Sequence, residues 1–188
     1  MSASVICPPF LAAPSRFFAP QLVSTEPWAL ARQGLVFQAS TGDVDVPVNG
    51  GKLFLVLQNP GGSGKLLQVF GVGANQYSIF SDLFAQNNPT FSTPLTPVTI
   101  QSTNSAETLS SVAQAYMVTE TPPPSTPPDG VLLARNLAAA SWVTNNFVPG
   151  LWVIPPGTAM AFVIYFYAST SAYDLGAISL IWGEVPIL

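Results

Sequence analysis

Residues 52–58 read KLFLVLQ and residues 65–72 read KLLQVFGV, with NPGGSG at residues 59–64 between them. The two flanking runs are rich in Leu, Val and Phe, which favour half-buried pleated strands. Proline and closely spaced glycines are typical of tight turns. The stretch from residue 52 to residue 72 therefore predicts two β-strands joined as a hairpin.

Short apolar runs of the same kind continue along the chain. The further strands that we expect cover residues 34–39, 96–101, 114–119, 130–136, 149–154, 159–168 and 175–184. Eight or nine short strands between Gly- and Pro-rich turns are typical of a sandwich or jelly roll. We therefore predict an all-β chain with a single jelly-roll β-sandwich domain at residues 32–188. Weaker helical spacing occurs at residues 75–85 and 132–142.

The run at residues 159–168 is apolar on both faces of the expected strand. Its two alternating sets are Phe162, Ile164 and Phe166, and Val163, Tyr165 and Tyr167. A strand of this kind is covered on both sides. We expect the second sheet to cover one face and a neighbouring subunit to cover the other.

Two proline-rich segments interrupt the strand pattern. Residues 1–31 are rich in Pro and Phe, and proline prevents regular ladder pairing, so we expect an extended N-terminal arm. This arm either drapes over a neighbouring subunit or packs on its own domain. Residues 119–130 read TETPPPSTPPDG and predict a stiff surface loop of polyproline type.

The composition is unusual because charge is scarce while hydrophobic residues are abundant. Only 7% of the residues are charged, against about 25% in typical proteins, and 48% are hydrophobic. Low charge protects a protein poorly against association. We therefore expect apolar surface to be buried between subunits, as in a symmetric oligomer.

The same composition disfavours several classes of function. Histidine is absent, so Ser-His-Asp and Cys-His chemistry are excluded, and we predict no enzyme and no catalytic residues. A net charge of −4 with five scattered basic residues argues against nucleic-acid binding. Cys7 is the only cysteine, which excludes an intrachain disulfide. The longest apolar run has about half the length that a membrane helix needs, so we expect no membrane partner.

Two local motifs suggest ligands but lack the full patterns. The run Gly61-Gly62-Ser63-Gly64-Lys65 lacks the glycine and hydroxyl positions of a phosphate loop and precedes a predicted strand. Asp43 and Asp45 are two carboxylates in an acidic turn, whereas calcium takes six to eight oxygens. We predict neither a cofactor nor a metal.

Tryptophans offer one alternative site. Trp28, Trp142, Trp152 and Trp182, together with the tyrosines, would form a sugar-binding platform if they gathered on one surface. Jelly rolls include lectins, so a carbohydrate- or receptor-binding module is an alternative function. Aromatic core and interface packing is the competing interpretation.

Two turn motifs resemble those of a known protein family. They are the NPGGSGK turn at residues 59–65 and the PPGT turn at residues 155–158, which precedes the last two apolar strands. This order resembles tailed-phage virion proteins of the head-decoration or head-fibre type. The resemblance implies a jelly-roll domain, tumour-necrosis-factor-like and trimeric, on a capsid surface, and it implies no catalytic residues.

These observations predict a non-enzymatic virion structural protein. We expect it to be made in the host cytoplasm and to decorate or cement a phage capsid as a homotrimer bound to the major capsid protein or other shell proteins. A small single-jelly-roll major capsid protein is the nearest alternative. The candidate interface residues are Phe10, Phe17, Phe18, Trp28, Asn59, Pro60, Ser63, Trp152, Phe162, Phe166 and Trp182. We expect the arm and the 59–64 turn to contact the lattice, and the others to form the core or a subunit interface.

Overall fold

The computed structural model describes residues 27–47, 50–76, 81–106, 109–120, 129–134, 143–146, 152–167 and 173–187, with residues 76, 143–146 and 173 described by their backbone alone. One helix, α2 (Pro27–Arg32), precedes the strands. The strands are β1 (Val36–Ser40), β2 (Val44–Pro47), β3 (Lys52–Asn59), β4 (Lys65–Gln76), β5 (Ser81–Asn87), β6 (Thr96–Pro97), β7 (Ile100–Ser102), β8 (Gln114–Glu120), β9 (Val131–Ala134), β10 (Val143–Asn146), β11 (Trp152–Ile154), β12 (Thr158–Phe166) and β13 (Tyr173–Pro186).

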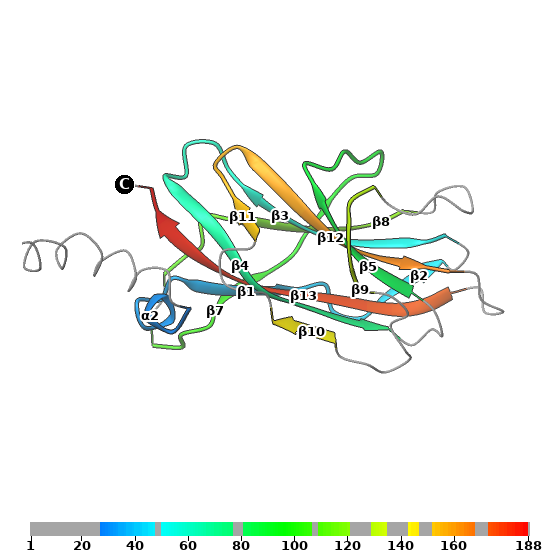
Figure 1. The fold of residues 1–188 in the computed structure, drawn as a ribbon, viewed down its shortest axis with the longest axis horizontal. Helices are drawn as coiled ribbons and strands as arrows, with labels where there is room; N and C mark the ends of the chain where they lie inside the picture. The colour runs from blue at the N-terminus through cyan, green and yellow to red at the C-terminus, as the bar shows by residue number, and fades with distance from the viewer. Residues whose placement is uncertain are drawn as a thin grey trace, which may run out of the picture.

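Within these residues the strands form two antiparallel sheets. The seven-stranded sheet has the order β10-β4-β13-β1-β7, with β11 also paired to β4 and β2 to β13. The six-stranded sheet has the order β6-β8-β3-β12-β5-β9. Figure 1 shows the sheets as two layers, with β3, β12 and β5 over β4, β13 and β1. The prediction of an all-β, sandwich-like chain is confirmed.

The hydrophobic core lies between the two layers. Alternate residues of the central strands point inward and are fully buried, among them Ile178, Leu180 and Trp182 of β13 and Phe162, Ile164 and Phe166 of β12. Burying an aliphatic or aromatic side chain of this size contributes about 1.5–3 kcal/mol. The period-two alternation read from the sequence is therefore the source of the layered fold.

The predicted hairpin between residues 52 and 72 is wrong in its pairing. Both strands exist, but β3 pairs with β8 and β12, whereas β4 pairs with β10, β11 and β13. The 59–64 turn thus carries the chain from one sheet to the other. Both strands are central in their sheets, which the apolar composition suggested, but composition does not encode which neighbour a strand takes.

Several local predictions also differ from the structure. The helical spacing at residues 75–85 gives the end of β4 and then β5, so that prediction is wrong over the described residues. The single strand expected at residues 96–101 is split into β6 and β7, which belong to different sheets. The strands β2 and β10 were not predicted. Helix α2 crosses the expected boundary between arm and domain at residue 31, because proline is well accepted in a first helical turn.

Gly51 provides a test of the close packing between β2 and β3. A Cβ atom added at Gly51 would overlap the backbone oxygen of Pro47, and backbone cannot move aside as a flexible side chain can. We expect Gly51→Ala to lower the free energy of unfolding by about 2–3 kcal/mol, at the upper end of overpacking costs. Chemical denaturation would measure the loss. Gly61→Ala is the matched control, since nothing lies within 4 Å of its added Cβ, and an equal loss in both variants would contradict this account.

Candidate functional site

The outer face of the seven-stranded sheet contains an uncharged area, which we call the open face. Cross-strand register places Gln38 beside Ile181 and Gln101, Ser40 beside Ser179, and two glycines of β4 beside β13. The open face consists of Gln38, Ser40, Gly71, Gly73, Gln101, Ser179 and Ile181. All of its side chains are neutral, and most are short.

Apolar groups are exposed on the open face. Ile181 is 42% exposed, although the residues on either side of it in β13 are fully buried. A Cβ added at Gly71 would meet nothing within 4 Å, so the surface above this glycine is empty. Leu175, two outward positions beyond Ser179, is also exposed. A neutral sheet face of this kind is suited to packing against another protein surface.

A groove of about 300 Å³ lies on one side of the open face. Its lining residues are Gln38, Ala39, Ser40, Thr99, Gln101, Ser179, Leu180 and Ile181. The Gln38 amide nitrogen donates to the Gln101 side-chain oxygen at 3.5 Å, and the Ser179 hydroxyl donates to that of Ser40 at 3.1 Å. The groove thus offers amide and hydroxyl groups beside one exposed aliphatic side chain, and it can hydrogen-bond a neutral partner.

Helix α2 closes one end of the open face. A Cβ added at Gly183 would lie 2.6 Å from the Phe70 ring and 2.8 Å from a methyl group of Leu30, so both side chains pack over this glycine. Phe70 sits at a β-bulge between β4 and β13, which turns its ring onto the outer surface. Gly183 is the next outward position after Ile181. The helix and the groove therefore share the same face of the sheet.

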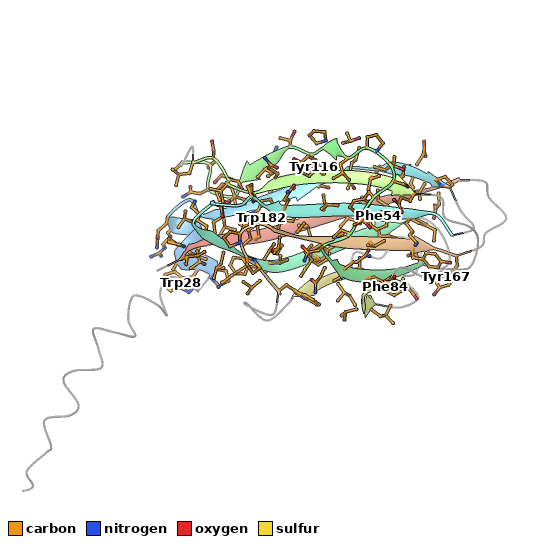
Figure 2. The ribbon with its side chains drawn as sticks, turned by 90° about the horizontal axis from the view of Figure 1, so that it is seen from above. Trp28, Phe54, Phe84, Tyr116, Tyr167 and Trp182 are labelled. Carbon is orange, nitrogen blue, oxygen red and sulfur yellow. The ribbon has the colours of Figure 1, made fainter. Side chains whose placement is uncertain are left out.

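The outer face of the six-stranded sheet carries a second apolar cluster, which the chain covers itself. Phe54, Phe84, Val163 and Tyr165 are at most 8% exposed there. Phe91, in the segment after β5, packs edge-on against Phe54 with ring centroids 5.0 Å apart. Figure 2 shows Phe54, Phe84 and Tyr116 on this sheet. The expectation that a neighbouring subunit covers this side of β12 is therefore wrong for the part that this segment covers.

Three of the candidate interface residues lie in the core. Phe162, Phe166 and Trp182 are fully buried between the sheets, so their side chains stabilise the domain and do not reach a partner. Trp152 is half-buried and packs against the edge of the same core. The rings of Phe37 and Trp182 lie 6.2 Å apart. Among the described residues the tryptophans do not form one platform, because Trp182 is inside and Trp28 lies on the surface of α2; Trp142 lies outside these residues.

The candidate lattice contacts at the 59–64 turn divide into buried and exposed groups. Asn59 is fully buried, and its side-chain nitrogen donates to the backbone oxygens of Lys65 and Ile154, both at 2.8 Å. It holds the turn from within and is not a surface contact, which corrects that prediction. Pro60 and Ser63 are half-buried, and the exposed part of the tip consists of glycines.

The candidate contacts in the arm are described only at its end. Phe10, Phe17 and Phe18 lie outside the described residues. Trp28 is 56% exposed on α2, and the Arg32 guanidinium lies 5.2 Å above its ring. The proline-rich loop is likewise undescribed between residues 121 and 128.

A buried carboxylate that the sequence did not single out joins three segments. Glu184 of β13 is fully buried, and the Lys65 ammonium donates to it at 2.8 Å. The Ser111 hydroxyl and the Val112 amide donate to its other oxygen at 2.5 and 2.9 Å. Every partner is a donor, as a buried carboxylate requires. The sequence signal for this site was that Glu184 is the one charged residue in the predicted strand at residues 175–184.

Other chemistry is sparse in the part of the chain that the structure describes. No group of three or more His, Cys, Asp or Glu side chains there is arranged to hold a metal, and Asp43 and Asp45 are exposed. No helix among these residues is long and apolar enough to span a bilayer. Comparison of the chain with protein-family models, curated proteins and solved structures found no match.

Proposed function

We propose that this chain is a non-enzymatic structural subunit of a virion. In this proposal it decorates or cements a phage capsid as a homotrimer, through contacts with the major capsid protein or other shell proteins. The observation that carries the proposal is the open face, a neutral sheet surface on which Ile181 is exposed. A surface of this kind is inexpensive to desolvate, because no charge has to be buried when two copies meet.

Strand pairing supports a jelly roll as the finer description of the fold. Eight of the described strands form a nested set of pairs; in chain order they are β1, β3, β4, β5, β9, β10, β12 and β13, and the other strands, β8 among them, extend the two sheets. The first pairs with the eighth, the second with the seventh, the third with the sixth and the fourth with the fifth. The pairs alternate between the two sheets, as in a long antiparallel hairpin wrapped into a sandwich of two Greek keys. This arrangement agrees with the resemblance to phage head proteins.

Self-association through the open face can be tested with Ile181→Glu. A carboxylate introduced at the centre of this face would have to be buried at the interface, so we expect association to weaken at least ten-fold while the fold is retained. Leu132→Glu is the matched control, because Leu132 has similar exposure but lies on β9 of the other sheet. Light scattering behind a sizing column measures both variants and the unchanged chain.

The expected mass of the unchanged chain is about three times 19.8 kDa. A monomeric unchanged chain, or equal dissociation of both variants, would contradict the assembly role of the open face. Copy number in purified particles then separates the two virion roles. Fewer copies than the main shell protein supports decoration, whereas an equal or greater number identifies the chain as the shell protein itself.

A further inference from the structure

The groove on the open face suits a neutral occupant that forms hydrogen bonds beside an apolar contact. Gln38 and Gln101 present side-chain amides, and Thr99, Ser40 and Ser179 present hydroxyls. Ile181 adds an apolar contact at 42% exposure. A volume of about 300 Å³ holds a short piece of extended chain and not a folded domain.

The segment that precedes α2 has the matching chemistry. Residues 1–26 contain four prolines and three phenylalanines but only two charged residues, Arg16 and Glu26. A proline lacks the backbone N–H, so an extended proline-rich segment offers carbonyl acceptors in excess. Amide and hydroxyl side chains satisfy such carbonyls, and Phe and Pro rings pack well against an aliphatic side chain.

The position of α2 brings this segment to the groove. Leu30 packs over Gly183, which is the next outward position of β13 after Ile181. The chain before Pro27 therefore starts at the same face of the sheet as the groove. At about 3.3 Å per extended residue, 26 residues span up to about 85 Å, which is enough to cross to a neighbouring copy.

We infer that the groove binds the N-terminal segment, residues 1–26, of a second copy of this chain. The inference rests on the proposed self-association, because a cyclic contact made by the open face of one subunit with its neighbour lets the segment of that neighbour reach the groove. Each subunit then gives a segment and receives one, which closes a symmetric oligomer. The segment acts as a strap between subunits.

The single native cysteine makes the test direct. In the full-length chain, Ser179→Cys places a thiol in the groove, and Cys7 provides the thiol in the segment. A second pair uses Ser15→Cys with Ser179→Cys in a Cys7→Ser background. After mild oxidation with diamide, non-reducing gels separate interchain disulfides from intrachain ones.

The expected result is an interchain ladder up to the covalent trimer in at least one of the two pairs. Its yield should be at least five-fold above that of the control Ser92→Cys, which keeps the same substitution but lies on the segment that covers the other sheet. A predominantly intrachain product, or yields equal to the control in both pairs, overturns the inference. Light scattering before oxidation separates the two failures, since a trimer without cross-links refutes the strap alone and a monomer refutes the proposed assembly.

Discussion

Replacing Glu184 with alanine is expected to lower the free energy of unfolding by about 3–5 kcal/mol, the usual range when one partner of a buried ion pair is removed. The substitution removes an acceptor from the Lys65 ammonium, the Ser111 hydroxyl and the Val112 amide at once. It also leaves a cavity where the buried carboxylate lay. Urea unfolding at fixed protein concentration would measure the loss, since oligomer stability depends on concentration.

Glu184→Gln is the informative partner of this variant. Glutamine keeps the shape and one acceptor oxygen, so it preserves the hydrogen bonds from Ser111 and Val112; its NH2 group cannot accept from the Lys65 ammonium, whose side chain is 24% exposed and can turn to water. We expect it to lose less than half as much stability as Glu184→Ala. A loss below about 1 kcal/mol for the alanine variant would show that this carboxylate does not hold the segments together.

Asn59→Asp is the second substitution with a large expected effect. The Asn59 amide nitrogen donates to two backbone oxygens from separate segments, and a carboxylate oxygen in its place would face two acceptors without a proton to share. Two lost buried hydrogen bonds at about 1–3 kcal/mol each, with an added buried charge, predict a loss of about 4 kcal/mol. The melting temperature and denaturant midpoint should both fall.

Asn88→Asp is the matched control for this prediction. The Asn88 side-chain oxygen accepts from the Ala159 amide at 2.9 Å, and a carboxylate accepts equally well. The same chemical change should therefore cost less than 1 kcal/mol at the exposed Asn88. Similar losses at the two positions would mean that the donor role of Asn59 does not determine its effect.

Strand positions could be predicted from the sequence because period-two alternation and turn residues are local signals. The runs that became β3, β4, β8, β12 and β13 are visible as apolar segments bounded by Gly or Pro. Pairing could not be predicted, because the NPGGSG turn is compatible with a hairpin and with a crossing between sheets. In the crossing between sheets, the buried Asn59 side chain donates to the backbone oxygens of Lys65 and Ile154. Because Ile154 is far along the chain, this contact cannot be read from the local sequence.

Predicting the candidate site from the sequence would have required the register between strands that are far apart in the chain. Gln38, Gln101 and Ile181 are neighbours only because β1 lies between β7 and β13 in one register. None of them belongs to a local motif, so no sequence signal pointed to the groove. The aromatic residues that the sequence did highlight were chosen by type, and type alone does not separate the core residue Trp182 from the surface residue Trp28.

The position of β13 has a consequence for how the domain forms. It is the last described strand to leave the ribosome, yet it pairs with β1, β2 and β4. Until residues 173–186 emerge, the seven-stranded sheet lacks its central strand, and the core side of the six-stranded sheet is only partly covered, by β1 and β4. Such non-local pairing makes folding slow, because long loops must close before their contacts stabilise the chain. The sandwich is thus complete only after β13 has been synthesised. Because β13 contributes Ser179 and Ile181 to the open face, contacts between subunits through that face also have to wait for this strand.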